Sequence, residues 1–531
     1  MLIILLAQLA RDYIEDAVSL ARPDRVGAAG RPPGQLRRQR QPLRARAAPA
    51  DYIEHVEQVV DTAEPLKARV RALAHSQPVG VLQQRAWALL FERIKTGQKV
   101  TVEALGGSMV TGFGTGCGAE CSYSALFASK LVKGQLLDYV NRAQGGMTTG
   151  GVLPMLPSLS TVHGKAPDLL IIDYSINDLH SEQDWRSSPF GADHSEQPLD
   201  NLTTSTQNHS GTVTGQFSVF QKVFAATEQL LCFLLEERPT TSILLVETPL
   251  CASNQASKRA HKIASGRYGV SFMEFGQLVL PTCSDRAELS AHAWGNQPLT
   301  ALHPPVAAHR VIAEALGRWL ELLEERAETE YWESRLLGVP LEHLVALMPG
   351  LIPQPVAPLA LRQAYQICKT PLSVFDAHGR DAAGGFKPQI VSGDWQLTED
   401  RPGKPGWVST TAGSILEFNL SFGLSPRVAI VYTRGYDRFG DVEMWLEPHE
   451  NRATLIKGCC NLNKVTQDEV LVASVQRNVH NPGYVQGNDP VYVEAMSLLY
   501  GVLPHSARVL RVRARPDGSR HAFKIVSVVS C

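Results

Sequence analysis

The stretch PDLLIIDYSIND, residues 167–178, joins an uninterrupted apolar run to a polar end. A strand that is apolar on both faces is typical of a parallel sheet covered on both sides. In such sheets, reactive groups collect at the edge where the carboxyl ends of the strands meet. Residues 167–178 therefore predict a buried parallel strand that places Asn177 at this edge.

Strands and amphipathic helices alternate on both sides of this stretch. Other strands are predicted within residues 99–105, 136–146, 241–250 and 269–275. The helices have apolar residues at three- and four-residue intervals and cover residues 51–73, 81–97, 123–135, 220–239, 254–268 and 303–325. This alternation predicts an α/β fold with a parallel sheet between two layers of helices.

The sequence changes character near residue 385, where short β-rich runs are separated by turns. Their spacing predicts an antiparallel β-sandwich. Five aromatic side chains of this region are of the kind that stacks on sugar rings, although strand aromatics are more often part of a core. They are Trp407, Tyr432, Tyr436, Trp445 and Tyr484.

The length of 531 residues exceeds what one ordinary core organises, so several domains are expected. The predicted segments are a disordered N-terminal segment (1–50), a helical lead-in (51–96), the α/β domain (97–326), a connector (327–384) and the sandwich (385–531). Between Arg22 and Arg46 there are eight arginines and one acid, Asp24. This composition cannot build a core, and a transit-like or phosphate-binding arm is the alternative interpretation.

Composition gives little reason to expect nucleic acid or membrane. The net charge is −1, and after the N-terminus no run of 18 uncharged apolar residues occurs. The apolar start MLIILLAQLA is too short to span a bilayer and has no basic residue before it, which leaves a degenerate signal or anchor as an alternative. We expect no nucleic-acid partner and no integral membrane domain.

Cysteines and sequons favour the secretory pathway slightly over the cytoplasm. Of the nine cysteines, Cys117 and Cys121 are close enough to form a disulfide in an oxidising compartment, while Cys459 and Cys460 cannot easily bridge each other. N-x-S/T sequons occur at Asn201, Asn208 and Asn419. We expect no cofactor, and no pair of CxxC motifs indicates a metal.

Ser108 lies in the glycine-rich stretch LGGSMVTGFGTGCGAECSY, residues 105–123, directly after a predicted strand. A serine hydroxyl becomes a good nucleophile when a base takes its proton, and glycines before it allow a tight turn. The stretch lacks the lysine of a phosphate loop and the G-x-G-x-x-G spacing of a dinucleotide site. On its own, it is equally compatible with a structural turn.

Three other pieces are suitable partners for Ser108. The segment NRAQGGMTT, residues 141–149, offers the Gly146 backbone N–H, and Asn177 offers a side-chain amide; both are suitable donors to an oxyanion. His303 precedes two prolines at the start of the last predicted helix of the α/β region, where it is well placed to act as a base. We expect His309 to be a packing residue. Taken singly, Asn177 and His303 are as well explained as turn, cap or surface residues.

Together, these pieces resemble the SGNH (GDSL-type) hydrolase family, named after its Ser, Gly, Asn and His residues, over residues 98–325. The resemblance implies a flavodoxin-like three-layer fold and a serine esterase without cofactor. It assigns Ser108 as the nucleophile and His303 as the base. The oxyanion hole would be formed by the Ser108 and Gly146 backbone N–H groups and the Asn177 side chain.

The chain departs from the family pattern at three positions. Gly107 replaces the aspartate of G-D-S, and Ser175 replaces the glycine of G-x-N-D. Thr300 stands where the family has the acid, three residues before the histidine, and losing the charge of this acid in a Ser–His–Asp triad costs about 10⁴-fold in turnover. Asp285 and Glu288 are the acids nearby in sequence. A Ser–His pair oriented by a backbone carbonyl is another solution.

The expected function is therefore acyl hydrolysis through an acyl-enzyme on Ser108, with an ester or an acylated carbohydrate as substrate. A β-sandwich after a hydrolase resembles the layout of many carbohydrate-active enzymes. Two alternatives remain open. One is a catalytically impaired protein that acts as a carbohydrate-binding module, and the other is an O-acyltransferase.

Overall fold

The computed structural model describes fifteen parts of the chain. They are residues 79–131, 137–159, 165–178, 218–248, 256–275, 303, 306–336, 352–377, 387–399, 404–435, 439–458, 467–474, 498–499, 501–515 and 522–531. The segment predicted to be disordered and the helix predicted at 51–73 lie outside these residues.

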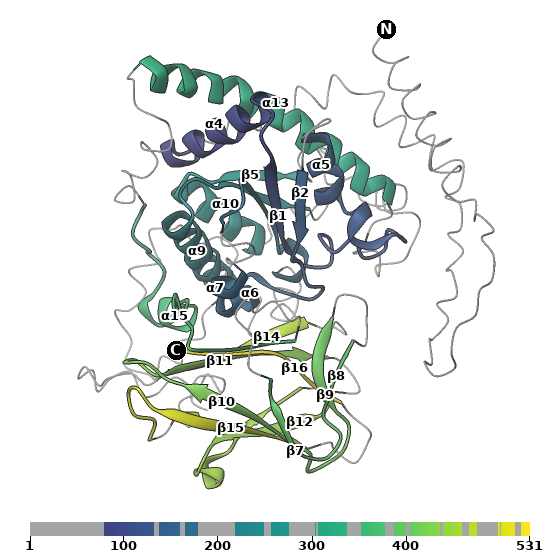
Figure 1. Ribbon diagram of the computed structural model, residues 1–531, viewed down its shortest axis with the longest axis vertical. Coiled ribbons are helices and arrows are strands. Elements are labelled where there is room, and N and C mark those ends of the chain that lie inside the picture. The colour runs from purple at the N-terminus through teal and green to yellow at the C-terminus, as the bar shows by residue number, and fades with distance from the viewer. Residues whose placement is uncertain are drawn as a thin grey trace, which may run out of the picture. The chain divides into compact units, whose positions relative to one another are not determined.

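Five parallel strands form one sheet in the order β2-β1-β3-β4-β5 (Figure 1). They are β1 (Val100–Gly106), β2 (Leu137–Asn141), β3 (Leu169–Asp173), β4 (Ser242–Glu247) and β5 (Ser271–Glu274). This order is that of flavodoxin-like folds, in which ligands bind where the strand order reverses, outside β1 and its neighbour β3. The α/β fold predicted from the alternation is confirmed.

Strand β3 is buried along its whole length, and its side chains alternate between two cores. Leu169 and Ile171 belong to one core, while Leu170 and Ile172 belong to the other. Successive side chains of a strand point to opposite faces, so an apolar residue at every position serves both layers.

Each core is completed by helices on one face of the sheet. The core of Leu169 includes side chains of α4 (Val81–Lys95), α5 (Tyr123–Leu131) and α13 (Val306–Leu336). The core of Leu170 includes side chains of α9 (Val219–Glu237) and α10 (Ala256–Tyr268). Helices α4 and α13 lie side by side, as do α9 and α10 (Figure 1). Shorter helical segments are η1 (Gly118–Cys121), α6 (Thr149–Val152), η2 (Leu153–Met155), α7 (Leu156–Leu159), α15 (Leu359–Ala364) and η7 (Glu450–Arg452).

The ends of two long helices have clear local causes. Ser218 and Gln221 form a reciprocal capping box that fixes the start of α9. Helix α13 continues to Leu336, beyond the end predicted at residue 325. The extension RAETEYWESRL contains neither glycine nor proline and is rich in good helix formers, so nothing in it stops the helix.

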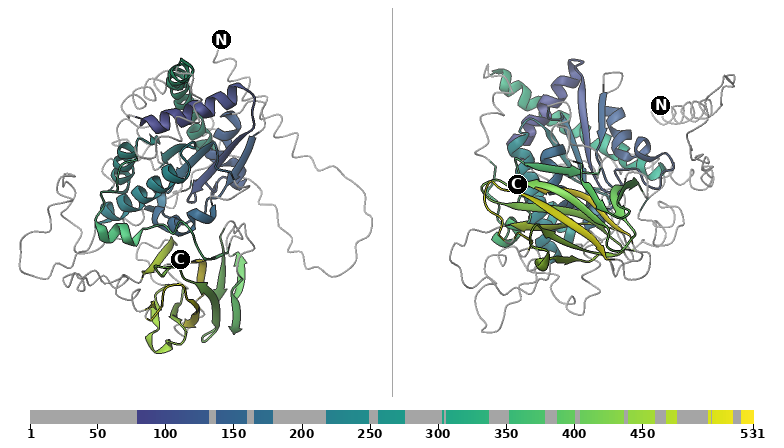
Figure 2. Two further views of the ribbon diagram at one scale, coloured as in Figure 1. Left: turned by 60° about the vertical axis from the view of Figure 1, so that its left-hand side comes forward. Right: turned by 60° about the horizontal axis from the view of Figure 1, so that its bottom comes forward.

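The C-terminal region contains two antiparallel sheets, which Figure 2 shows from two directions. One has the order β13-β12-β15-β10-β7, and the other β14-β11-β16-β9-β8 with β6 paired to β16. The strands are β6 (Ser373–Asp376), β7 (Gln389–Ser392), β8 (Gln396–Glu399), β9 (Pro405–Ser409), β10 (Ile415–Ser421), β11 (Arg427–Arg434), β12 (Asp441–Leu446), β13 (Thr454–Ile456), β14 (Gln467–Ser474), β15 (Ala507–Arg515) and β16 (Phe523–Ser530). The predicted β-sandwich is confirmed.

Of the five aromatic residues considered for sugar stacking, the three that the structure describes are buried. Trp407, Tyr432 and Trp445 are 8%, 8% and 1% exposed. Their faces are covered by protein, so they do not offer a platform for a sugar ring. Tyr436 and Tyr484 lie outside the described residues.

The described part of the chain contains two disulfides. Cys117 bonds to Cys121, the pair that the sequence predicts, and Cys368 bonds to Cys531, a pairing not predicted. Of the three sequons, Asn419 is exposed on β10, and the other two lie outside the described residues. No helix in the described part of the chain combines the length and the apolar character needed to cross a bilayer.

Candidate active site

Ser108 is separated from the end of β1 by Gly107 alone, so it lies at the carboxyl edge of the sheet, where β1 runs between β2 and β3. The backbone N–H of Gly107 donates to the carbonyl of Asp173 at the end of β3, which fixes the turn against the neighbouring strand (2.9 Å). The carbonyl of Ser108 accepts from the Phe113 N–H (3.1 Å) and the Thr111 hydroxyl (2.8 Å). These hydrogen bonds stabilise the turn that holds Ser108, and the residue is 7% exposed.

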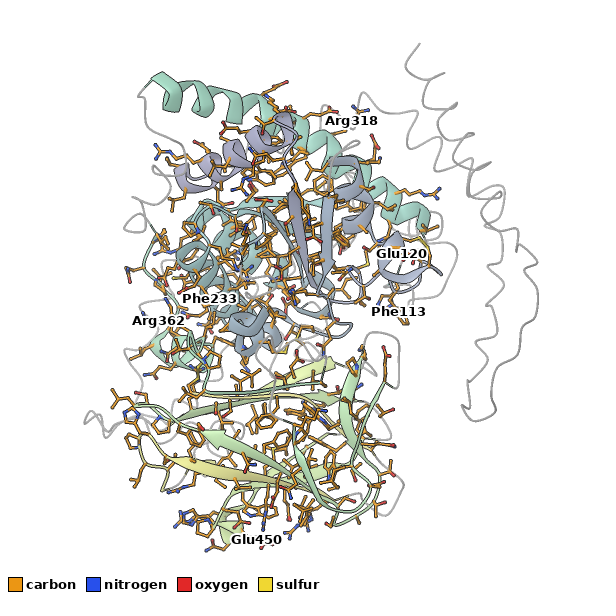
Figure 3. All side chains as sticks on the ribbon, viewed as in Figure 1. Phe113, Glu120, Phe233, Arg318, Arg362 and Glu450 are labelled. Carbon is orange, nitrogen blue, oxygen red and sulfur yellow. A yellow bond between two sulfur atoms is a disulfide. The ribbon has the colours of Figure 1, made fainter. Side chains whose placement is uncertain are left out.

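His303 meets Ser108 although 195 residues separate them in sequence. Its Nε2 lies 2.6 Å from the Ser108 Oγ, within hydrogen-bond reach. The Phe113 ring packs edge-on against the imidazole, with centroids 4.6 Å apart. Phe113 is itself 48% exposed and lies at the surface of the α/β region (Figure 3).

Gly114 lies against the backbone of His303. It has φ +92°, and a Cβ there would be 3.0 Å from both the Cβ and the carbonyl oxygen of His303. Any other residue would be strained by this backbone conformation and would press on the histidine. The loop after Ser108 therefore supports His303 by close packing.

Asn177 and the turn that contains Gly146 also border the turn of Ser108. The Asn177 Nδ2 donates to the carbonyl of Met147, the residue after Gly146 (2.7 Å). A Cβ on Gly145 would be 3.8 Å from the Ser108 Cβ, so this turn also borders the serine. The structure thus brings Ser108, His303, Asn177 and the turn of Gly146 together at one edge of the sheet.

Two departures from the family pattern have a physical reason in this chain. A Cβ on Gly107 would lie 2.1 Å from the Asn177 Nδ2, so the close approach of the amide requires glycine. The Ser175 hydroxyl donates to Oδ1 of Asp173 (2.5 Å) and also contacts the Thr248 hydroxyl (3.2 Å). Ser175 therefore forms part of a buried polar group around Asp173.

Asp173 is a buried carboxyl group that the sequence analysis did not identify. Hydroxyl groups of Tyr123 and Thr248 donate to its Oδ2 at 3.0 and 2.9 Å. Burial raises the pKa of Asp173 to about 6, and the nearby charge of Glu247 acts in the same direction, while the hydrogen bonds from Ser175, Thr248 and Tyr123 oppose the rise. Its position at the last residue of a buried strand was the available sequence signal.

His309 has the packing role that the sequence predicts. It is fully buried in α13, and its Nδ1 accepts from the Tyr123 backbone N–H (3.0 Å). Burial, together with the nearby His303, lowers the pKa of His309 to about 4, so the ring is neutral at ordinary pH.

The position of the expected acid, Thr300, lies outside the described residues, as do Asp285 and Glu288. Three other polar residues missed by the sequence analysis lie behind the site. They are Asp178, Glu247 and His261, and all are at most 3% exposed. No three His, Cys, Asp or Glu side chains in the described part of the chain are arranged to hold a metal ion.

No family model and no curated protein matches the sequence. In structure, the chain is similar to a two-domain esterase active on acetylated mannans (14% identity, 85% of this chain and 95% of that chain, TM-score 0.48). It is also similar to the psychrotrophic esterase EstA from Pseudoalteromonas sp. (15% identity, 42% and 98%, TM-score 0.28).

A family two carbohydrate esterase from Clostridium thermocellum, solved with cellohexaose, is similar as well (14% identity, 43% of this chain and 65% of that chain, TM-score 0.26). All three TM-scores lie below 0.5, so the function has to be inferred from the residues of this chain.

Proposed function

We propose that the chain is a serine esterase of SGNH type that hydrolyses a carboxylic ester through an acyl-enzyme on Ser108. The single observation that supports this most directly is the 2.6 Å separation of the Ser108 Oγ and the His303 Nε2, beside the amide of Asn177. A serine hydroxyl in contact with an imidazole is an activated nucleophile.

The reaction proceeds in two halves. His303 accepts the proton of Ser108 at Nε2 while the Ser108 Oγ attacks the ester carbonyl, and the protonated imidazole then gives this proton to the departing alcohol. Water attacks the acyl-enzyme with His303 as base, the carboxylic acid leaves, and Ser108 recovers its proton. In both halves, the negative oxygen is stabilised by the N–H groups of Ser108 and Gly146 and by the Asn177 side chain.

The orientation of the His303 imidazole is fixed by side-chain and backbone atoms that pack against it. The Phe113 ring and the Gly114 backbone contact it from the loop after Ser108. A fixed imidazole needs less reorganisation when the serine proton moves, which compensates in part for an acid that is absent at Thr300.

We infer further that the ester is carried by a glycan. A β-sandwich following an α/β hydrolase region is the layout of many carbohydrate-active enzymes, and this analogy supports the substrate class. The two-domain esterase named above acts on acetylated mannans, which makes acetylated manno-oligosaccharides the first substrates to test.

The alternative of a catalytically impaired glycan-binding protein predicts binding without turnover. The three described aromatics first considered for sugar stacking are buried, so a sandwich that binds sugar would have to use other residues. An O-acyltransferase would form the same acyl-enzyme but release it to an alcohol faster than to water.

The deciding experiment compares wild type, Ser108→Ala and Ser129→Ala with p-nitrophenyl acetate and acetylated manno-oligosaccharides. Ser129 is exposed on α5 and is the matched control. We expect wild type and Ser129→Ala to be equally active and Ser108→Ala to fall to background. Equal background rates for all three on both substrates would eliminate the esterase. Added glycerol that diverts acetate to a glycerol ester would identify the transferase.

A further inference from the structure

A buried chain of ionisable groups begins at Asp178, the residue after Asn177, and continues through His261 to Glu247. The Nδ1 of His261, on α10, is 2.8 Å from Oε2 of Glu247, the last residue of β4. Its Nε2 is 3.1 Å from Oδ2 of Asp178. His261, Glu247 and Asp178 are 2%, 0% and 3% exposed, so these contacts are shielded from water.

Both ring nitrogens of His261 face carboxylate oxygens, and an imidazole can donate to both only when it carries two protons. Burial by itself lowers the pKa of His261, but the charge of Glu247, the hydrogen bonds to Asp178 and Glu247, and the charge of Asp178 together raise it to about 10. The ring is therefore an imidazolium at neutral pH and bridges two anions.

Asp178 extends this chain to Thr149, three residues after Gly146. Its Oδ1 accepts from the backbone N–H of Thr149 (3.1 Å), and its Oδ2 accepts from the Thr149 hydroxyl (2.5 Å). Thr149 is 2% exposed and is the first residue of α6.

Two parallel connections consequently join the same two stretches of backbone. Asn177 donates to the carbonyl of Met147, and the next residue, Asp178, accepts from Thr149. Two of the three donors proposed for the oxyanion hole adjoin these connections, because Gly146 precedes Met147 and Asn177 precedes Asp178.

We infer that His261 is a positioning residue for ester hydrolysis: as an imidazolium it fixes Asp178 and, through Thr149, holds the Gly146 turn and Asn177 in the geometry that binds the oxyanion. This inference rests on the proposed function. A network that serves stability alone would alter the free energy of unfolding and leave the kinetics of the folded enzyme unchanged.

The test measures kcat and KM of the full chain with p-nitrophenyl acetate for His261→Gln, Glu247→Gln and Ser265→Ala. Glutamine at 261 is neutral and cannot bridge two carboxylates, whereas glutamine at 247 keeps a hydrogen-bonding group and removes one charge. Ser265 is the matched control, because it is buried on the same helix and donates to the His261 carbonyl without touching the carboxylates (2.7 Å).

We expect His261→Gln to lower kcat by roughly tenfold to a hundredfold, somewhat less than the loss of an oxyanion donor itself, with KM changed by less than about threefold. Glu247→Gln should retain more activity than His261→Gln, and Ser265→Ala should keep the wild-type kcat. Urea unfolding at the assay temperature shows whether each variant is folded under the conditions of the assay.

An unchanged kcat in folded His261→Gln, with lower stability, would overturn the inference and leave the esterase intact. An equal loss of kcat in Ser265→Ala would also overturn it, since disturbance of α10 would then be the cause. Should His261→Gln fail to fold, Glu247→Gln and Ser265→Ala still separate these outcomes. Wild type that is no faster than Ser108→Ala removes the proposed function and the inference with it.

Discussion

The amide nitrogen of Asn177 lies 2.1 Å from the point at which a Cβ on Gly107 would be placed. Real Cβ atoms do not come so close to a heavy atom, so Asn177 occupies space that any larger residue at position 107 would claim. The position at which SGNH hydrolases usually have aspartate is thus closed to every side chain here.

We expect Gly107→Ala to displace Asn177 and to lower kcat by about 10²–10³-fold, as removal of an oxyanion-hole donor does. Gly266→Ala is the control, because Gly266 lies within α10 with no atom within 4 Å of the added methyl group. Alanine is the better helix former, so this control should keep full activity and unfold at an equal or higher temperature. Steady-state kinetics and thermal unfolding of both variants check the prediction, and an active Gly107→Ala would contradict it.

Ser175→Gly, which introduces the residue typical of SGNH hydrolases, should destabilise this chain. It removes a donor from the buried Asp173 carboxyl and adds backbone freedom in the unfolded state. Leaving a buried acceptor short of a partner costs about 1–3 kcal/mol. Urea unfolding at pH 7 measures the loss, and unchanged stability would mean that another donor replaces the hydroxyl.

Stability should fall in two separate windows as the pH rises. The folded-state pKa of Asp173 is raised from 3.8 to about 6, so the stability linked to its protonated form is lost between these values. The pKa of His261 is raised from 6.5 to about 10, so the stability linked to the imidazolium is complete below pH 6.5 and is lost up to about pH 10. The charged groups that face the ring are Glu247 and Asp178, and Asp173 lies within the field of Glu247.

Urea unfolding from pH 4 to pH 10 tests these windows with two variants. Asp173→Asn should flatten the lower window and His261→Gln the upper one. If the free energy of unfolding of His261→Gln falls as steeply above pH 6.5 as that of wild type, another group titrates there.

Loss of one disulfide should mainly lower activity, and loss of the other should mainly lower stability. Cys117–Cys121 spans four residues beside the loop that contacts His303, so its removal changes chain entropy little but loosens that loop. Cys117→Ala/Cys121→Ala should lower kcat several-fold with a small change in the melting temperature.

Cys368–Cys531 spans 163 residues, and Cys368→Ala/Cys531→Ala should lower the free energy of unfolding by about 2–5 kcal/mol while leaving kcat unchanged. The reverse pattern would contradict the support of His303 by this loop.

The sequence predicts those features that depend on local pattern. The apolar run of β3, the periodic helices and the turn after β1 were sufficient to place Asn177 and Ser108 at one edge of a parallel sheet. The SGNH resemblance added His303, which precedes the proline pair at the start of α13.

Features that depend on pairing across the fold could not be predicted in the same way. His261 reads as one polar residue on an amphipathic helix, and nothing in periodicity reveals that it lies between Glu247 and Asp178. The disulfide between Cys368 and Cys531 could not be predicted for the same reason, since nine cysteines permit many pairings. Strand and helix patterns indicate which face is buried, but they do not specify which polar groups meet there.

Because β3 is buried on both faces, the number of its residues is more restricted than the choice of apolar residue at each position. Leu169 to Ile172 are all aliphatic and feed two cores alternately, so exchanges between leucine and isoleucine are tolerated on either face. Deleting one of these residues would turn the remainder of the strand over and draw Asn177 back by about 3.3 Å, the rise of one strand residue. Over the course of evolution, β3 should therefore accept substitutions freely and insertions or deletions hardly at all.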